Sequence, residues 1–537
     1  MGQAPMAANM NEGIKRQNAS VWFIPAVAFS FFVLYAITAQ RGVSWQDSGE
    51  YQYRVLAGDY QWHSGIARSH PFYILMARIF SVNFPTPSRF YAVNLFSGLG
   101  LSLSLAVLAR NVVLLTRSSW AAVFAVVLLG FAHMAWWLGT VAEVYTWSLA
   151  FLMIEVYCLI RFAEKAEGRW LLALFGVNGL HFGIHNAALL GMPVYVFLLA
   201  SEMRRLRGRC AGVVCGSLVF WLVGGGLVIG QAVRVLHETG EPYHVVKSVL
   251  FGEGYARYIL GTDGGGARLW LANMALAGIS FANPGWLFAW RGLLFRDETK
   301  RKSLRGWLLG LTVLHGFFWI RYCVPDQATF VLPTLGLLAL WAGIGAGRGP
   351  LFKDCEGALV ATKVPLKFLR VRQNGYRLTV IVLTAASAVA VPWLINGAVR
   401  LSGIDVGRSR ALPFRDESRY WLLPWKQGED SAARFASAVG EQLASGDVLF
   451  ADATSASPLM ATRQAGVLKG EWRLITPWSG ETGEVLSELL RNKARRVYVV
   501  SPVKGYVPGV LLEDAKKVVR EGVLFRVYGN KDNQVIE

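Results

Sequence analysis

Cysteines and nucleotide-binding motifs are scarce in this chain of 537 residues. The five cysteines are Cys158, Cys210, Cys215, Cys323 and Cys355, and no two of them form a CxxC pair. A zinc site of the cysteine type is therefore not expected, and the region after Cys355 needs no disulfide even if it is exported. The C-terminal region also lacks a GxGxxG motif, which argues against dinucleotide binding.

Charge is sparse as well, whereas apolar residues are abundant. Charged residues make up 17% of the chain and hydrophobic residues 54%, with 20 Trp and 30 Phe. Repeated apolar runs of about twenty residues indicate a polytopic membrane protein. The net charge of +19 comes from basic residues in the short loops between these runs. Cytoplasmic loops that face anionic lipids explain this charge better than a nucleic-acid partner does.

The apolar runs predict about eleven transmembrane helices. They lie near residues 21–39, 91–110, 119–139, 142–162, 169–186, 187–202, 211–235, 269–290, 305–323, 327–346 and 378–398. We interpret the first run as an uncleaved anchor after a cytoplasmic N-terminal segment, 1–20. With this orientation every cytoplasmic loop is rich in Lys and Arg, and the C-terminal region lies outside. The expected location is a bacterial inner (plasma) membrane.

Outside the membrane, two loops and one domain are long enough to fold. The first loop, 40–90, contains an apolar stretch, 71–80, that is too short to span and is expected at the interface. The second loop, 236–268, contains a glycine-rich turn. Residues 400–537 alternate predicted strands with helices, which is typical of a small α/β domain with mainly parallel strands. The predicted strands are 448–451, 473–476, 497–500 and 523–527, and the predicted helices 429–445, 482–494 and 511–521. The fold class is thus an α-helical membrane domain, 21–399, followed by a soluble α/β domain.

Two carboxylates follow the first span, in Trp45-Gln46-Asp47-Ser48-Gly49-Glu50. Ionised groups at a membrane boundary need water, a partner or a cavity, so they indicate function by default. One helical turn would place Asp47 and Glu50 on the same face. They suit a general base with its orienting partner, or part of a metal site. The alternative is a solvated acid that caps the next helix.

Further polar residues from distant parts of the chain fall on the same side of the membrane. They are His70, Glu143, His181, His185, Arg321 and Asp326. A cavity that opens to the outside explains this convergence, although chance placement at a wet interface explains each residue taken alone.

Each of these residues has two interpretations. His70 donates to a phosphate or marks a turn, and Glu143 serves the site or pairs with an Arg or a helix N-terminus. The i, i+4 spacing of His181 and His185 suits one metal ion or simple helix packing, so a divalent metal stays open. Arg321 suits bidentate phosphate binding, or an ion pair with Asp326 that closes a turn.

Several short motifs, in order, carry a family resemblance. They are Asp47-Ser48-Gly49-Glu50, His70-Pro71, Ala142-Glu143-Val144-Tyr145, the segment Gly179–Asn186, Pro325-Asp326-Gln327 and Phe330-Val331-Leu332-Pro333. Together they resemble the family of transmembrane protein 260, protein O-mannosyltransferase-like members of the GT-C glycosyltransferases. The resemblance covers about residues 20–345 and does not include the C-terminal domain. The stretch after His70-Pro71 is shorter than is common in the family, and it lies near the expected donor phosphate.

The resemblance implies a multispan fold with an active site on the non-cytoplasmic face. The donor would be a sugar on a polyprenyl phosphate, and the acceptor a protein or glycan hydroxyl, commonly of a protein. Asp47 would act as the base, with inversion in a single displacement. The competing hypotheses are a flippase or transporter of a lipid-linked glycan, and a sensor or scaffold with a membrane anchor. Broken helices with polar residues at the bilayer midplane would favour the transporter.

Overall fold

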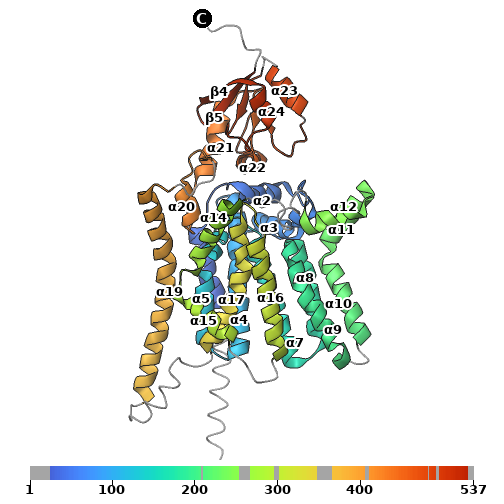
Figure 1. Ribbon diagram of the computed structural model, residues 1–537, viewed down its shortest axis with the longest axis vertical. Helices are drawn as coiled ribbons and strands as arrows, with labels where there is room; N and C mark the ends of the chain where they lie inside the picture. Colours follow the sequence, from blue (N-terminus) through green and yellow to red (C-terminus); the bar gives the residue numbers. More distant parts are fainter. Residues whose placement is uncertain are drawn as a thin grey trace, which may run out of the picture.

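The computed structural model describes residues 24–206, 210–252, 266–294, 302–347, 366–404, 410–481, 483–491 and 495–529. A bundle of long helices carries a small sheet domain on one end (Figure 1). Parts of the predicted organisation lie outside the described residues. They are the N-terminal segment 1–20, residues 253–265 of the second loop and the basic stretch 348–365.

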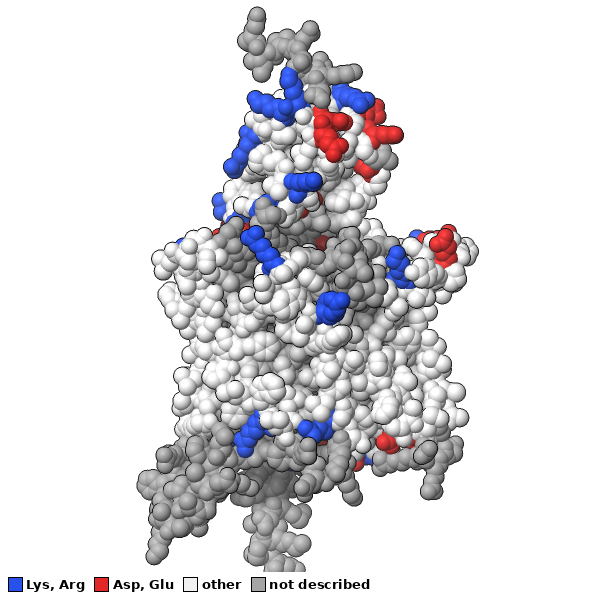
Figure 2. All heavy atoms as spheres, viewed as in Figure 1, with Lys and Arg blue, Asp and Glu red and all other residues white. Residues whose placement is uncertain are grey.

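Five helices of the described chain are long and apolar enough to cross a membrane, or six if one bent pair is counted as a span. The five are α4 (Arg89–Thr116), α7 (Tyr145–Lys165), the run of η2 (Asn186–Gly191) into α9 (Met192–Leu206), the run of η6 (Gln327–Val331) into α17 (Leu332–Gly347), and α19 (Leu366–Ser402). Lys, Arg, Asp and Glu are nearly missing from the middle of the visible face and gather towards its two ends (Figure 2). Such an apolar belt suits the hydrocarbon core of a bilayer, so the chain is an integral membrane protein.

The other predicted spans are shorter than expected or broken. Residues 119–139 divide into α5 (Ser119–Gly130) and α6 (His133–Leu138). Residues 269–290 divide into α14 (Gly266–Gly278) and α15 (Leu287–Leu294), with the turns η4 (Ile279–Phe281) and η5 (Pro284–Trp286) between them. Glycine and proline favour such breaks because glycine is flexible and proline lacks an N–H group. Of the eleven predicted spans, five or six are thus long and apolar enough to cross a membrane in the part of the chain that the structure describes, and two others are interrupted by turns.

One predicted span and the loop after it form a bent helical structure. α10 (Cys210–Gly224) and α11 (Gly226–Thr239) meet at an angle of 74°, at three successive glycines. α12 (Pro242–Phe251) follows directly and packs back against the first loop. Residues 236–252, predicted as a loop, are thus mainly helical. The α11–α12 pair projects at the level of the outer end of the bundle (Figure 1).

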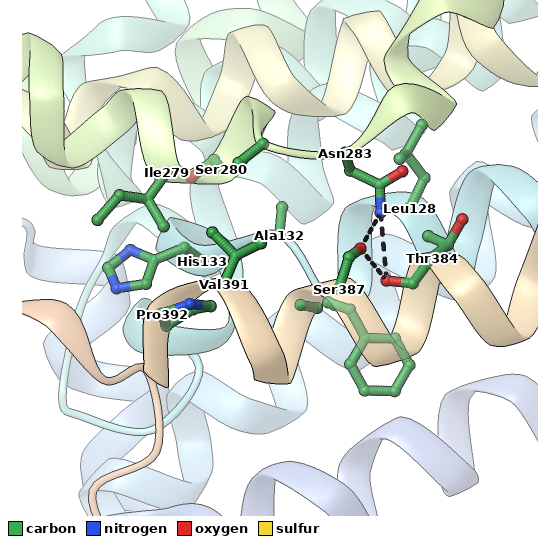
Figure 3. Close-up of a pocket in the computed structure, with 13 residues that line it drawn as sticks. Leu128, Ala132, His133, Ile279, Ser280, Asn283, Thr384, Ser387, Val391 and Pro392 are labelled. Carbon is green, nitrogen blue, oxygen red and sulfur yellow. Dashed lines mark hydrogen bonds between the residues drawn. The ribbon is translucent and has the colours of Figure 1, made fainter. Parts of the chain in front are cut away.

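The long helix α19 stands at the side of the bundle and is only loosely packed against it. Asn283 holds it, since its amide donates to the carbonyl of Thr384 at 3.2 Å and to the hydroxyl of Ser387 at 2.8 Å (Figure 3). The cavity beside these bonds has a volume of only about 20 Å³. This is room for about one water molecule and not for a substrate.

The first predicted outside loop, 40–90, lies across the end of the bundle that carries the sheet domain (Figure 1). It contains α2 (Gln46–Ala57), the short turn η1 (Ile66–Arg68) and α3 (Pro71–Asn83). Pro71 begins α3, where its missing N–H group costs nothing and its fixed φ suits a helix. The short apolar stretch 71–80 is thus a helix that does not span. The remaining described spans of the bundle are Ile24–Thr38, α8 (Gly168–Ile184) and α16 (Lys302–Arg321).

The C-terminal domain contains a five-stranded mixed sheet in the order β2-β1-β3-β5-β4. The strands are β1 (Val448–Phe450), β2 (Arg473–Ile475), β3 (Val497–Val499), β4 (Ala515–Glu521) and β5 (Leu524–Gly529). β1 pairs with β2 and β3 in parallel, whereas β5 pairs with β3 and β4 antiparallel. The helices are α20 (Glu417–Leu422), α21 (Ser431–Gln442), α22 (Ala453–Gln464), α23 (Gly483–Arg491) and α24 (Gly509–Glu513).

One predicted helix of this domain is wrong. Residues 511–521 have a helical charge pattern, yet only the first of them belong to α24 and the rest form β4. A tight hairpin at Gly522, with φ of +57°, turns the chain back so that β4 pairs with β5 along its length. Pairing with a neighbouring strand has therefore overridden the local helical preference.

The sheet domain is fixed to the first loop by direct packing of α22 on α2. Trp45, just before α2, donates its indole N–H to Ser431 at 2.7 Å and packs its ring 5.1 Å from that of Phe435. Gly49 makes the close approach possible, because a Cβ atom there would lie 2.2 Å from the carbonyl oxygen of Ser44 and 3.0 Å from the Cβ of Ser457. The glycine of the Asp47–Glu50 motif thus serves the contact between the domains.

The segment that leads into the domain is bound to the bundle as well. The backbone N–H of Lys426 donates to Thr38 at 2.7 Å, and Thr140 donates to the carbonyl of Pro424 at 2.9 Å. The amino group of Lys426 is buried and donates to the carbonyls of Tyr420 and Leu423. Burial lowers the pKa of Lys426 to about 7. Hydrogen bonds from this segment therefore hold the domain on the bundle, in addition to the packing at Trp45.

Candidate active site

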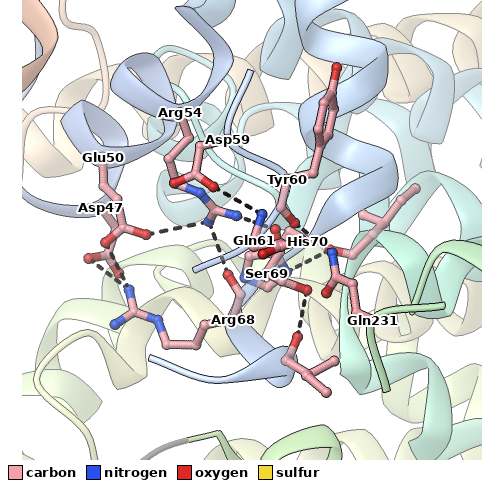
Figure 4. A network of polar contacts seen from close by, with 12 residues as sticks. Asp47, Glu50, Arg54, Asp59, Tyr60, Gln61, Arg68, Ser69, His70 and Gln231 are labelled. Carbon is pink, nitrogen blue, oxygen red and sulfur yellow. Dashed lines mark hydrogen bonds and ion pairs between the residues drawn. The ribbon is translucent and has the colours of Figure 1, made fainter. Parts of the chain in front are cut away.

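Asp47 and Glu50 lie on one face of α2 and share a cation, Arg68 of η1 (Figure 4). One guanidinium nitrogen of Arg68, Nη2, is 3.5 Å from Asp47 Oδ1 and 3.3 Å from Glu50 Oε2. The i, i+3 spacing thus brings the two carboxylates together as the sequence predicts. Neither Arg68 nor its role was predicted.

A second guanidinium, that of Arg54, holds Glu50 from the other side. Arg54 Nη1 is 3.5 Å from Glu50 Oε1 and donates to the carbonyl of Arg68 at 3.0 Å, while Nη2 donates to the carbonyl of Ser69. The guanidinium also lies 5.0 Å from the ring of Trp62. Arg54 therefore ties α2 to the turn that carries Arg68.

The two carboxylates differ sharply in exposure. The side chain of Asp47 is 42% exposed, whereas that of Glu50 is 4% exposed. Burial raises the pKa of Glu50 to about 7, although Arg68 and Arg54 both lower it. Asp47 thus faces solvent with one cation beside it, and Glu50 is enclosed between two cations.

Glu143 lies beside this pair, just before α7. Its carboxylate accepts a hydrogen bond of 2.8 Å from Ser48, and its backbone N–H donates to Ser97 at 2.8 Å. Burial and the charge of Asp47 raise the pKa of Glu143 well above its usual value. The structure thus brings this predicted residue to the acidic pair, through the serine of the same motif.

His70 and His185 stack at 5.2 Å between ring centroids, and the ring of Tyr145 lies 5.3 Å from that of His185. The hydroxyl of Tyr145 donates to Asp326 at 3.4 Å. His70 Nδ1 lies 2.8 Å from the carbonyl of Ile184, which must accept, so Nδ1 carries the proton. Burial and His185 keep the pKa of His70 well below its usual value.

His70 therefore positions α3 and the end of α8 in this structure. A neutral imidazole protonated at Nδ1 has only an acceptor nitrogen left, which does not bind phosphate. His70 also adopts a left-handed conformation, with φ of 46°, at the N-cap of α3. The geometry favours the turn interpretation over the phosphate interpretation.

His181 does not meet His185 around a shared ion. Its Nδ1 bonds to Glu155 at 2.9 Å and its Nε2 to the hydroxyl of Ser148 at 2.7 Å, so both nitrogens are engaged. The Nδ1 of His185 accepts from the backbone N–H of Ala187 at 2.9 Å. Among the residues with described placement, no group of three His, Cys, Asp or Glu could hold a metal ion.

Arg321 and Asp326 flank a short turn, as the sequence predicts. Arg321 ends α16 and is exposed, and Asp326 precedes η6 and is partly buried. Three important residues were missed by sequence reasoning: Arg54, Arg68 and Glu155. The signal for Glu155 was present, because an ionisable residue inside a predicted span indicates a paired, buried group.

The comparisons with known proteins agree with this arrangement. Residues 47–207 match the sequence model of the family described as Protein O-mannosyl-transferase TMEM260 N-terminal domain. The family resemblance is confirmed. The matched segment begins at Asp47 itself and ends in α9 or just after it. No curated protein matches the chain in sequence.

Similarity of the whole fold extends beyond the matched segment. The crystal structure of ArnT from Cupriavidus metallidurans bound to undecaprenyl phosphate aligns with a TM-score of 0.57 at 14% identity, over 96% of this chain and 98% of that chain. The same ArnT in the apo state aligns with a TM-score of 0.53 at 14% identity, over 95% and 98%. The chain therefore shares the fold of ArnT over nearly its whole length, with its C-terminal domain included in the alignment.

Proposed function

We propose that this protein is an integral-membrane glycosyltransferase that moves a sugar from a polyprenyl-phosphate donor to a hydroxyl acceptor, with protein Ser or Thr as the first candidate. The name of the matched family supports a protein acceptor and a mannosyl group. The undecaprenyl phosphate named in the ArnT structure supports a lipid-linked donor. The proposed organisation is a membrane domain, 21–399, and an extracytoplasmic α/β domain, 400–537, in a bacterial inner membrane.

The observation that carries the proposal is the different exposure of the clustered carboxylates. Glu50 and Glu143 are buried, at 4% and 5% exposure, whereas Asp47 is open to an incoming hydroxyl at 42%. Arg68 lies 3.5 Å from the Asp47 carboxylate and orients it without burying it. Asp47 is therefore our candidate for the general base.

The reaction then follows as one displacement. The acceptor oxygen forms a bond to the anomeric carbon while its proton passes to the Asp47 carboxylate. The bond between that carbon and the phosphate oxygen breaks, and the electron pair leaves with the phosphate. Because the phosphate is a good leaving group, no strong general acid is needed. Attack from the face opposite the leaving group inverts the anomeric configuration.

The remaining residues bind or position. Glu50 holds the guanidinium groups of Arg54 and Arg68, and thereby the turn that faces Asp47. Arg68 and the exposed Arg321 are the candidates for contact with the donor phosphate, since guanidinium groups match phosphate geometry. Glu143, His70, His185, His181 and Asp326 support the walls of the site, and no metal ion takes part in this scheme.

The test compares Asp47→Asn with wild type in purified protein supplied with polyprenyl-phosphate sugars and a lysate of acceptor proteins. We expect loss of transfer with unchanged thermal stability. Asp514→Asn, on the far side of the sheet domain, is the matched control and should keep full transfer. Full transfer by Asp47→Asn would refute the role of Asp47.

The same preparation separates a transferase from a flippase. The bend between α10 and α11 is the feature that a flippase of lipid-linked glycans would share. Wild-type protein in liposomes is given a lipid-linked sugar on one leaflet, and translocation is followed alongside transfer. Translocation without transfer to any acceptor would replace the proposed function by the flippase.

A further inference from the structure

A second cavity lies beside the carboxylate site, between the first loop and the α11–α12 pair. Its volume is about 200 Å³. Its polar lining residues are Gln61, His63, Ser69, Gln231, Arg234, Glu238, His244 and Ser248. We propose that this cavity binds a neutral sugar unit of the substrate that lies outside the reacting bond.

The charge of the lining argues for a neutral ligand. The cationic group of Arg234 is paired with Glu238 at 2.6 Å, so the one guanidinium of the cavity is already neutralised by a carboxylate. Burial lowers the pKa of His63 to about 4, with Arg68 and Arg54 adding to the effect, so His63 is neutral at pH 7. Arg54 and Arg68 do not line the cavity and are paired with Glu50 and Asp47. A phosphate would therefore meet the Glu238 carboxylate and no unpaired guanidinium of the lining, whereas hydroxyl groups meet no such repulsion.

The chemistry of the lining suits hydroxyl groups. Amides, hydroxyls and neutral imidazoles each offer donors or acceptors, and a sugar hydroxyl needs both. The side-chain amide nitrogen of Gln231 donates to the carbonyl of Tyr60 at 2.6 Å, while its amide oxygen makes no hydrogen bond with the described residues (Figure 4). Gln231 is thus held in place with an acceptor to spare.

Aromatic rings form one rim of the cavity. The ring of His63 lies 3.9 Å from that of Trp62 and 4.6 Å from that of Trp478, between centroids. Trp478 of the sheet domain does not line the cavity but packs against His63 and supports it. Trp62 and His63 do line the cavity, and the apolar atoms of their rings suit the C–H groups of a sugar. The combination of ring faces and polar side chains matches the two-sided chemistry of a saccharide.

The cavity is also preformed. Ser248 of α12 accepts a hydrogen bond of 3.0 Å from the backbone N–H of Ile66, and the bond from Gln231 to Tyr60 fixes α11. Pockets for drug-sized ligands have about 300–1,000 Å³, so the smaller cavity here suits one sugar ring. Because these walls are fixed before the ligand arrives, the entropic cost of binding is lower.

The position of the cavity decides which sugar it would hold. Asp47 and Glu50 do not line it, although Ser69 and Ile66, on either side of Arg68, do. A sugar here is therefore next to the reacting centre but not at it, as a further unit of a donor glycan or a glycosylated acceptor would be. This assignment rests on the proposed function for the identity of the substrate, but binding itself does not.

The test is saturation-transfer NMR on the full chain, reconstituted in lipid discs so that no sugar-based detergent competes. The probes are the methyl glycosides of mannose, glucose and galactose, with inorganic phosphate as competitor. We expect a saturable saturation-transfer signal, and hence binding, for at least one methyl glycoside. Inorganic phosphate should not reduce this signal. His63→Phe keeps the ring between the two indoles but removes its nitrogens, and should weaken binding roughly fivefold or more. Trp478→Ala, which removes the ring that packs against His63, should also weaken binding.

The controls separate this assignment from the proposed function. Trp290→Phe, at an exposed tryptophan of α15, should bind as wild type does. Asp47→Asn should bind the glycoside normally even when transfer is lost, so a failure of the base assignment leaves the binding result intact. Three results would overturn the sugar site. They are a lack of any saturable binding signal, competition by phosphate, and normal glycoside binding by a well-folded His63→Phe.

Discussion

Two polar networks of this protein each contain a buried glutamate, but they differ in their exposure to solvent. At the outer end, Asp47 and Glu50 share Arg68 at 3.5 and 3.3 Å, and Asp47 remains open to solvent. Inside the bundle, Glu155 is 1% exposed and accepts three hydrogen bonds. They come from Asn178 at 3.0 Å, His181 at 2.9 Å and Tyr195 at 2.6 Å.

The difference between these networks shows which polar groups still have hydrogen-bond donors or acceptors free for a substrate. The partners of Glu155 are themselves satisfied, because Asn178 also donates to Ala188 at 2.9 Å and accepts from Trp221 at 3.0 Å. Such a closed network stabilises a fold and excludes ligands. The network around Asp47 is open on one side. Residue type alone does not separate the two cases, whereas exposure and hydrogen-bond partners do.

The largest expected effect is on catalysis, from Asp47→Asn. Removing a general base lowers the rate of transfer by about 10²–10⁴-fold. The unfolding midpoint should stay near that of wild type, since the carboxylate is 42% exposed and loses only one ion pair at 3.5 Å. Transfer kinetics and a thermal unfolding curve on the same sample check both parts. A large fall in stability would show that Asp47 stabilises the fold, as we expect for Glu155.

The converse result is expected for Glu155→Ala. Three donors lose a buried acceptor, so the free energy of unfolding should fall by about 3 kcal/mol or more. Transfer per folded molecule should change little. Unfolding in detergent measures the first quantity, and activity normalised to folded protein the second. Glu167→Ala, in the turn after the same helix, is the control, because its ion pair with Arg169 is exposed and such a pair contributes at most about 1 kcal/mol. An inactive but stable Glu155→Ala would show that the closed network takes part in catalysis.

Gly49→Ala tests whether the open network depends on the domain above it. Its Cβ would lie 2.2 Å from Ser44 O, in the segment before α2, and 3.0 Å from Ser457 Cβ of α22, so the start of α2 must shift against both neighbours. Overpacking of this kind costs about 1–3 kcal/mol. We expect lower stability and lower transfer together, measured by unfolding and by kinetics. Gly306→Ala in α16, where the new Cβ meets open space, should cause neither loss.

The pH dependence of stability gives a finer test of Glu50. Its pKa is about 7 in the folded protein, above the usual value of 4.5. Folding therefore takes up a proton between these values, and the contribution of Glu50 to stability decreases as pH rises from 4.5 to about 7. Glu50→Gln cannot titrate, so its unfolding midpoint should fall less over this range. Parallel curves for wild type and variant would show that Glu50 ionises normally.

The smallest expected effect belongs to the hydrogen bond between Trp45 and Ser431. Trp45→Phe keeps most of the ring packing but loses the 2.7 Å bond, which is worth about 1 kcal/mol. The double variant with Ser431→Ala should lose less than the sum of the two single variants. Denaturant unfolding of all four proteins forms the cycle. Additive losses would mean that the bond does not contribute to domain docking.

The membrane class and much of the soluble domain could be predicted from local patterns. Apolar runs identify helices because the bilayer leaves few alternatives, and four strands were placed within about two residues of β1, β2, β3 and β5. β4 was missed because its pairing with β5 lies outside the range of any local pattern. α22 was missed as well, since its small and polar residues show no clear apolar face before α2 is placed against them.

The candidate site was predictable only in part. The spacing of Asp47 and Glu50 was visible in sequence, and the structure adds that both meet Arg68. That contact depends on how the turn at η1 folds back, which no periodic pattern reports. The spacing of His181 and His185 left a metal site and helix packing open for the same reason, because i, i+4 spacing places side chains near one another but does not say what else competes for their nitrogens. His181 is bound by Glu155, from another helix.

The packing of α22 on α2 means that one part of this protein can fold completely only late in its synthesis. α2 begins at Gln46 and α22 at Ala453, so some four hundred residues are synthesised between the two halves of this contact. At ribosomal rates of about 5–20 residues per second, roughly 20–80 seconds pass between the synthesis of α2 and that of α22. A nascent chain therefore carries α2 without the helix that packs on it, and any truncation before α22 leaves Gly49 without its contact to Ser457. The proposed site thus receives its final surroundings only when the C-terminal domain has been made.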